Sequence, residues 1–171
     1  LKSCIGNRSL GWDLLPPGSQ RFEQDGMIYA GYKDSPDKWK KGETPKAIGW
    51  YAGVQYDGDI ANAKRVLAEL DSYYPGAKKY EIAGFLWWQG DKDRYNAAHS
   101  AVYEKNLHQL LKALRKEFNA PKAKMVVATL GQTNKDSTSG NEKLIIDGMF
   151  AFAKAHEGDV TTVYTHPLSI C

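Results

Sequence analysis

The stretch Gly84-Phe85-Leu86-Trp87-Trp88-Gln89-Gly90-Asp91-Lys92-Asp93 decides the fold class, because in it an apolar run passes directly into a polar turn. The continuous apolar run over residues 82–88 predicts a strand that is covered on both faces. In an open α/β sheet, ligands bind at the carboxyl ends of the strands, so the turn marks a candidate site. An amide beside a flexible glycine suits a developing oxyanion, and neighbouring tryptophans suit a sugar. Successive strand residues point to opposite faces, so one of the two tryptophans is expected in the core.

Helical and strand patterns alternate along the rest of the chain. Residues 11–56 show no sustained period, apart from a short helix expected around residues 27–33. The order of elements predicts one domain over residues 1–171, with a parallel sheet of about four or five strands in flavodoxin-like order and helices on both faces, a three-layer α/β/α sandwich. The remaining expected elements are strands at 1–5, 125–129 and 160–164 and helices at about 60–70, 102–118 and 142–156. Asp57 or Asp59 is expected to cap the first of these helices, and residues 73–76 to end it.

The composition is that of a globular protein of one domain. The chain has 171 residues, 42% hydrophobic and 25% charged, which is long enough to bury a core. A net charge of +3 is mild, and Lys38, Lys40 and Lys41 fall in an expected loop, which argues against a nucleic-acid groove. No apolar run reaches the roughly 18 residues that a membrane span needs.

Neither the cysteines nor the helical histidines indicate a metal site. Cys4 and Cys171 lie near opposite ends, and two unpaired thiols are favoured over a disulfide. His99, His108 and His156 are spaced at nine residues or more, unlike metal ligands, and are expected to be solvated on their helices.

Two blocks carry a resemblance to a known family. Residues 84–93 resemble the Trp-x-Gln-Gly-Glu-x-(Asp/Asn) block of the sialate O-acetylesterase-like carbohydrate esterases, a branch of the SGNH-hydrolase superfamily. Residues 2–10 resemble that family's second block, Lys-x-x-x-Gly-Gly-x-Ser-Leu. Shorter motifs at residues 15–17, 118–121 and 163–168 are similar to motifs of bacterial members, so the resemblance spans essentially the whole chain.

The resemblance implies an esterase that removes acetyl groups from carbohydrates by a serine nucleophile, without metal or organic cofactor. In the family, a serine of a Gly-Gln-Ser-Asn block attacks the ester and an Asp/His pair near the C-terminus activates it. The oxyanion is held by the serine's own N–H, the glycine of the second block and the amide of the third. By position, Gly6 is the backbone donor, Gln89 is the side-chain donor and Gly90 allows close approach.

The chain departs from the family pattern at the residues that carry out the attack. It contains neither the Gly-Gln-Ser-Asn block nor a C-terminal Asp-x-x-His. We therefore expect a partial domain, an internal portion whose catalytic serine and histidine lie outside this chain, and which alone is inactive. The sequence does not indicate the cellular compartment of the protein. Action on polymeric glycans would imply a secreted or periplasmic protein.

Further residues beside the two blocks are candidate substrate ligands, namely Asn7, Arg8, Trp88, Asp91, Asp93 and His166. Structural alternatives stay open for several of them. Gln89 could only satisfy loop backbone groups, Gly6 could be a plain turn glycine, and Arg8 could pair with Asp13. Asp91 and Asp93 could cap the helix that follows.

Two other functions are compatible with the sequence. The segment Asn7-Arg8-Ser9-Leu10-Gly11 is similar to the Gly-x-Ser-x-Gly nucleophile elbow of α/β-hydrolases. With Ser9 as nucleophile, Asp136 or Asp159 and then His166 would complete the Ser, Asp, His order of that fold's triad. Against this elbow, residues 12–18 include Pro16-Pro17 and no helical pattern. The other alternative is a non-catalytic domain that binds a carbohydrate or a protein partner.

Overall fold

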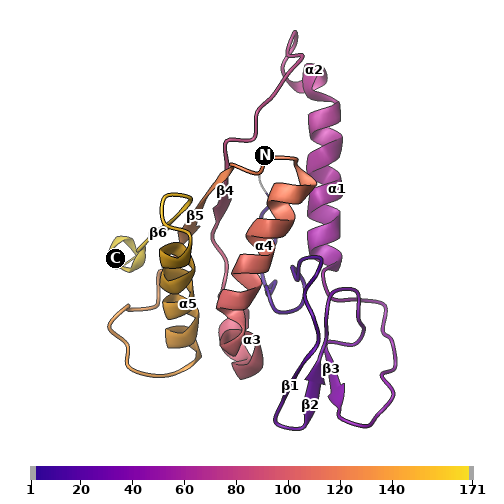
Figure 1. The fold of residues 1–171 in the computed structure, drawn as a ribbon, viewed down its shortest axis with the longest axis vertical. Coiled ribbons are helices and arrows are strands. Elements are labelled where there is room, and N and C mark those ends of the chain that lie inside the picture. Colours follow the sequence, from indigo (N-terminus) through magenta and orange to yellow (C-terminus); the bar gives the residue numbers. More distant parts are fainter. Residues whose placement is uncertain (1–2, 170–171) are drawn as a thin grey trace.

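The computed structural model describes residues 3–169 and shows an α/β chain with two separate sheets (Figure 1). The larger sheet holds three parallel strands in the order β4 (Gly84–Trp87), β5 (Lys124–Ala128) and β6 (Val160–Val163). Each connection between them contains a helix, as parallel strands require. The predicted α/β class with a parallel sheet is confirmed, with three strands in the described residues where four or five were expected.

Helices α4 (Tyr103–Glu117) and α5 (Asn141–Ala155) cover one face of this sheet. In α4 the buried apolar residues recur every three to four positions, which places them on one side of the helix. They meet the inward side chains of the strands, such as Met125 and Val127, and those of α5, such as Met149 and Phe152. Both helices lie where the sequence predicted them.

The other face of the sheet is open in the described residues. Leu86 of β4 is 86% exposed, and Val163 of β6 is also exposed. The expectation of a strand covered on both faces is therefore wrong for β4. An apolar run indicates a strand, but the number of layers around it depends on elements that are distant in sequence.

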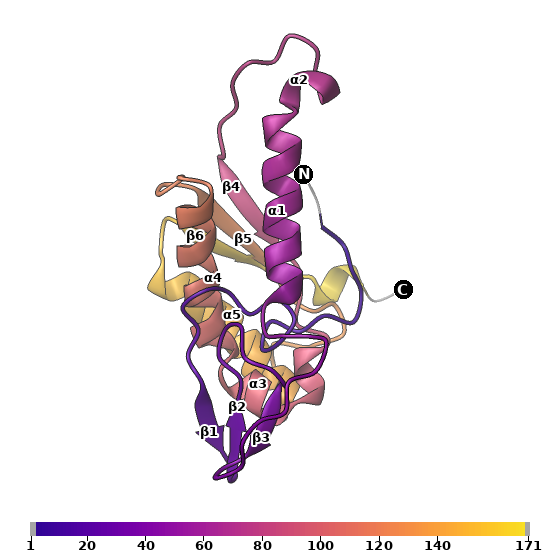
Figure 2. The same cartoon turned by 90° about the vertical axis from the view of Figure 1, so that its right-hand side faces the viewer.

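The smaller sheet is antiparallel and lies at the opposite end of the molecule from α2 (Leu70–Tyr73), as Figure 2 shows. Its strands are β1 (Phe22–Gln24), β2 (Met27–Tyr29) and β3 (Lys38–Lys40). The expected helix around residues 27–33 is wrong, because β2 is the central strand. Asp25 and Gly26 both have positive φ, 51° and 73°, which is the geometry of a two-residue hairpin turn. The expected strand at residues 1–5 is also wrong for residues 3–5, which form no strand, and the other two lie outside the described residues.

Helix α1 (Val54–Ala68) begins earlier than expected and is not capped by either aspartate. Its N-cap residue is Gly53, with φ 92° and no side-chain cap. Asp57 instead accepts hydrogen bonds from the hydroxyls of Tyr32 and Tyr51, at 2.5 and 2.9 Å, which ties the preceding loops to the helix. The predicted end is confirmed, since α2 stops at Tyr73. The remaining short elements are η1 (Asp93–Tyr95), α3 (Ala97–Ala101) and η2 (His166–Leu168).

The helical histidines are not all solvated, which corrects the expectation from sequence. His99 on α3 is only 5% exposed and packs edge-on against the Tyr29 ring. His108 and His156 join α4 to the end of α5, with 2.8 Å between Nδ1 of the first and Nε2 of the second. Cys4 is exposed and forms no disulfide within residues 3–169, while Cys171 lies outside the described residues.

The burial of His99 predicts a loss of stability in acid. Desolvation lowers its pKa from 6.5 to about 4, so the unfolded chain binds a proton more readily than the folded chain. This contribution to stability is present above pH 6.5 and is lost as the pH falls toward 4, by about 2–3 kcal/mol. Urea unfolding at pH 7 and pH 4 measures it as the difference between the wild type and His99→Gln. Parallel pH profiles for the two proteins would contradict the prediction.

Candidate active site

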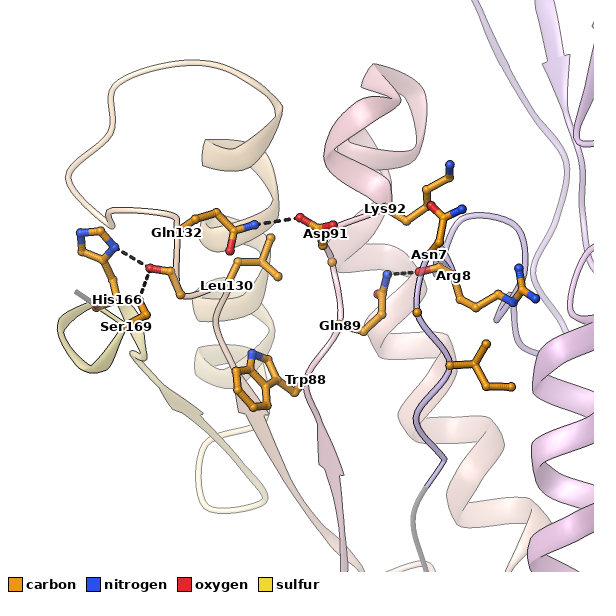
Figure 3. A pocket seen from close by; sticks show the side chains of 14 residues that line it. Asn7, Arg8, Trp88, Gln89, Asp91, Lys92, Leu130, Gln132, His166 and Ser169 are labelled. Carbon is orange, nitrogen blue, oxygen red and sulfur yellow. Dashed lines mark hydrogen bonds between the residues drawn. The ribbon is translucent and has the colours of Figure 1, made fainter. Parts of the chain in front are cut away.

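A cavity of about 690 Å³ lies at the carboxyl ends of β4 and β5 (Figure 3). Its wall comes from four segments that are far apart in sequence: residues 5–8, residues 88–92, residues 130–132, and His166 with Ser169. In the figure, His166 and Arg8 lie on opposite sides of the opening. This is the edge of a parallel sheet at which α/β proteins bind ligands.

Gln89 joins the two segments that the sequence singled out. Its amide Nε2 donates to the carbonyl oxygen of Arg8 at 2.8 Å and to Oδ2 of Asp93 at 2.6 Å. Its Oε1 lies 3.2 Å from the Tyr103 hydroxyl, which also donates to the Gln89 carbonyl oxygen at 2.6 Å. A reversed amide would set Oε1 against two acceptors, so the donors fix the orientation of the side chain.

The two glycines of the blocks lie in different surroundings. Gly6 lies on the open wall, with no atom within 4 Å of the place where a Cβ would stand. Within residues 3–169, its N–H donates to no acceptor. Gly90 has φ 145°, a region that residues with a side chain avoid, and a Cβ there would approach Ile145 at 3.2 Å and the Tyr103 hydroxyl at 3.3 Å.

Asp93 is not brought to the cavity. It is fully buried and accepts hydrogen bonds from the N–H groups of Leu10 and Gly11, at 2.9 and 2.8 Å, besides that of Gln89. Burial raises the pKa of this carboxyl to about 6, although all three hydrogen bonds act in the other direction. Asp93 therefore supports the turn that carries the second block from beneath the cavity wall.

Asp91 lies at the rim of the cavity and holds neighbouring polar groups together. Its Oδ1 accepts from Nε of Arg94 at 2.8 Å. It also accepts from Nε2 of Gln132 at 2.9 Å, as Figure 3 shows. The 3-10 helix η1, which begins at Asp93, has no side-chain cap. The expectation that Asp91 or Asp93 caps the following helix is therefore wrong, and Asn96 instead caps α3.

The aromatic and cationic candidates flank the opening. Trp88 is 73% exposed and its indole N–H donates to the Thr129 carbonyl oxygen at 3.1 Å, while Trp87 packs against the core, as predicted for alternating strand residues. The Arg8 guanidinium stacks 4.9 Å above the Trp50 ring and stands 3.9 Å from Asp13. Both arrangements leave Arg8 on the cavity wall.

Asn7 and His166 also line the cavity, from its two sides. Asn7 has φ 59°, a left-handed conformation that asparagine tolerates. His166 begins η2, and its Nδ1 lies 2.6 Å from the carbonyl oxygen of Gly131, which holds the ring in place. Eight of the nine site residues that were expected from the sequence thus line one cavity, and Asp93 is the exception.

Sequence reasoning missed the part of the wall that follows β5. Leu130, Gly131 and Gln132 follow that strand after Thr129, and Ile5, Lys92 and Ser169 complete the lining. The same rule that marked the end of β4 could have found the residues after β5, because both strands end at one edge of the sheet.

The alternative nucleophile Ser9 is not available. It is buried, and both its N–H and its hydroxyl donate to Oδ2 of Asp13, at 2.9 and 3.2 Å. A nucleophile elbow leads directly into a helix, but residues 10–14 form a turn and no helix follows Ser9 directly. Of its expected acid partners, Asp136 pairs with Lys135, and Asp159 pairs with Arg115 and Lys124. The structure therefore contradicts the elbow.

The described part of the chain holds neither a cluster of metal-ligating side chains nor a helix that could span a membrane. No group of three or more His, Cys, Asp or Glu side chains among residues 3–169 could hold a metal ion. In the same residues no helix has the length and apolar character to cross a membrane.

Comparison with known proteins gives a matching family and a similar solved structure. Residues 34–168 match the family model described as carbohydrate esterase, sialic acid-specific acetylesterase. The crystal structure of an Arabidopsis thaliana protein is similar at 22% identity and a TM-score of 0.43, over 60% of this chain and 38% of that one. The chain thus spans well under half the length of that protein. A search of curated protein sequences found no match.

Proposed function

The chain belongs to the carbohydrate esterase family of sialic acid-specific acetylesterases, and on this premise we propose that its cavity stabilises the oxyanion during removal of acetyl groups from sugars. The observation that carries the proposal is that Gly6 and Gln89 line the same cavity. Attack on an ester carbonyl places negative charge on its oxygen, and preorganised N–H donors are what lowers the barrier.

The two donors have different tasks in this proposal. The Gly6 N–H is free to donate within the described residues, and no side chain crowds it. Both N–H groups of the Gln89 amide have partners, Arg8 and Asp93, so in this proposal the whole side chain rotates on substrate binding and gives one of these hydrogen bonds up to the oxyanion. Gly90 lets the backbone pass close to Ile145 and Tyr103, which sets the height of the amide.

The rest of the wall suits a sugar ring that carries the acetyl group. The exposed face of Trp88 offers an apolar platform, while Asn7, Arg8, Asp91 and His166 offer polar groups for hydroxyls. The serine nucleophile and its Asp/His partners come, in this proposal, from parts of the protein outside residues 1–171, because this sequence contains neither family block.

The test is acetate release by a longer protein that contains this chain and its flanking segments. O-acetylated sialic acid, acetylated xylo-oligosaccharide and 4-nitrophenyl acetate serve as substrates, with the unacetylated sugars as blanks. We expect release from at least one acetylated sugar at a rate above that for 4-nitrophenyl acetate. Binding of the sugars without any release would favour the non-catalytic alternative and overturn the proposal.

Replacement of Ser9 by alanine in the same longer protein is expected to leave acetate release within about twofold of the wild type. Ser9 is buried under the second block, and its hydroxyl only donates to Asp13, a net contribution of about 1 kcal/mol to stability. Initial rates at saturating substrate measure the effect. Inactivity in a variant that still folds would restore Ser9 as nucleophile.

A further inference from the structure

A second cavity, of about 260 Å³, lies between α4 and the segment that leads into the antiparallel sheet. It shares no lining residue with the candidate active site. We propose that this cavity binds a single acidic sugar residue, a pyranose ring that carries a carboxylate. The proposal goes beyond the esterase function and does not depend on it.

Two polar side chains without a partner in the described residues lie at this cavity, and one of them is fully buried. Asn106 lines it and is only 6% exposed; its side-chain amide has no partner among residues 3–169, but it is not one of the fully buried unpaired groups. The hydroxyl oxygen of Ser19, which also lines the cavity, is fully buried and has no partner in the described residues. Buried polar groups are seldom left unpaired, because each one costs about 1–3 kcal/mol. A ligand hydroxyl would satisfy Ser19 once its side chain rotates, and would also bond to the amide of Asn106.

The charge at the opening is positive and unneutralised. Lys105 and Lys112 line the cavity seven residues apart, which is two turns of α4 on the same side of the helix. Neither lysine forms an ion pair within the part of the chain that the structure describes. The nearby Glu104 lies 3.5 Å from Nε2 of His108 instead. Two free ammonium groups favour a ligand with a carboxylate over a neutral one.

The remaining wall fits the apolar face of one sugar ring. Leu15 and Ala30 are buried side chains, and Phe22 stacks on Tyr29 with 4.9 Å between ring centroids. Aromatic rings supply an apolar surface on which the C–H face of a pyranose can lie. A volume of about 260 Å³ is below the range of drug-sized pockets, about 300–1,000 Å³, so it admits one ring and not an oligosaccharide.

Titration of the isotope-labelled 171-residue chain, followed by amide and side-chain NMR signals, tests the proposal. The probes are D-glucuronate, N-acetylneuraminate and methyl α-D-glucuronoside, with D-glucose as the neutral control. We expect at least one acidic probe to shift the signals of Asn106 and Ser19, and to bind about tenfold or more tightly than glucose. If the free acid and its methyl glycoside bind equally well, the ligand is an acidic residue within a glycan. If the methyl glycoside does not bind, the ligand is a free sugar acid.

The matched variants separate local charge from net charge. Lys105→Ala with Lys112→Ala removes both cations at the cavity and is expected to weaken glucuronate binding about tenfold or more. Lys116→Ala with Lys154→Ala removes two exposed lysines elsewhere, neither of them at the cavity, and is expected to change it less than twofold. Equal effects of the two pairs, equal affinity for glucose, or shifts confined to other parts of the chain would each overturn the proposal. Because no catalysis is measured, failure of the esterase assay leaves this result intact.

Discussion

Replacement of Gln89 by alanine is expected to lower the turnover of acetyl esters by about 100- to 1,000-fold in the longer protein that contains this chain. The substitution removes the side-chain donor of the proposed oxyanion site. It also frees the carbonyl of Arg8, to which Gln89 now donates at 2.8 Å, so the second block is held less firmly. The oxyanion exists only in the transition state, so kcat should fall and KM should change little. Steady-state acetate release measures both constants.

Gln132→Ala is the matched control for this experiment. Gln132 is also a glutamine on the cavity wall, but its amide donates to Asp91 at the rim and to no part of the second block. We expect its turnover to stay within about threefold of the wild type. Urea unfolding of both variants shows whether they fold equally well. A folded Gln89→Ala variant with an unchanged rate would remove Gln89 from the oxyanion site.

Replacement of Phe152 by alanine is expected to lower the free energy of unfolding by about 3–5 kcal/mol. Phe152 on α5 is fully buried, and its ring lies edge-on to those of His108 and His156, with 5.0 Å between centroids in both pairs. Its removal would leave a cavity at the junction of α4 and α5. Urea unfolding of the 171-residue chain measures the change.

Phe150→Ala, two residues earlier on the same helix, is the control. Phe150 is 38% exposed and belongs to neither core cluster, so the same loss of side-chain atoms should cost about 1 kcal/mol or less. A similar loss of stability in both variants would mean that α5 does not pack on the sheet through Phe152.

The local patterns of the sequence were sufficient for the α/β class and for most of the regular elements. The apolar spacing of residues 103–114 gave α4, and the apolar runs gave β4, β5 and β6, because such periods reflect which side of an element is buried. The rule that ligands bind at strand ends also brought Gln89 and His166 to the right edge of the sheet. The hairpin of β1 and β2 was missed, although Asp25-Gly26 carries its turn signal.

Side-chain surroundings, in contrast, were decided only by the tertiary structure. Asp93 accepts from Leu10 across 83 residues of sequence, and no local pattern indicates that this carboxylate is buried. The same holds for His99 under Tyr29, for the exposed Leu86 and for the cavity around Asn106. The physical reason is that periodicity records which neighbours along the chain share a face. Burial, pKa and cavities depend on which distant elements meet that face, and this is fixed only when the elements pack.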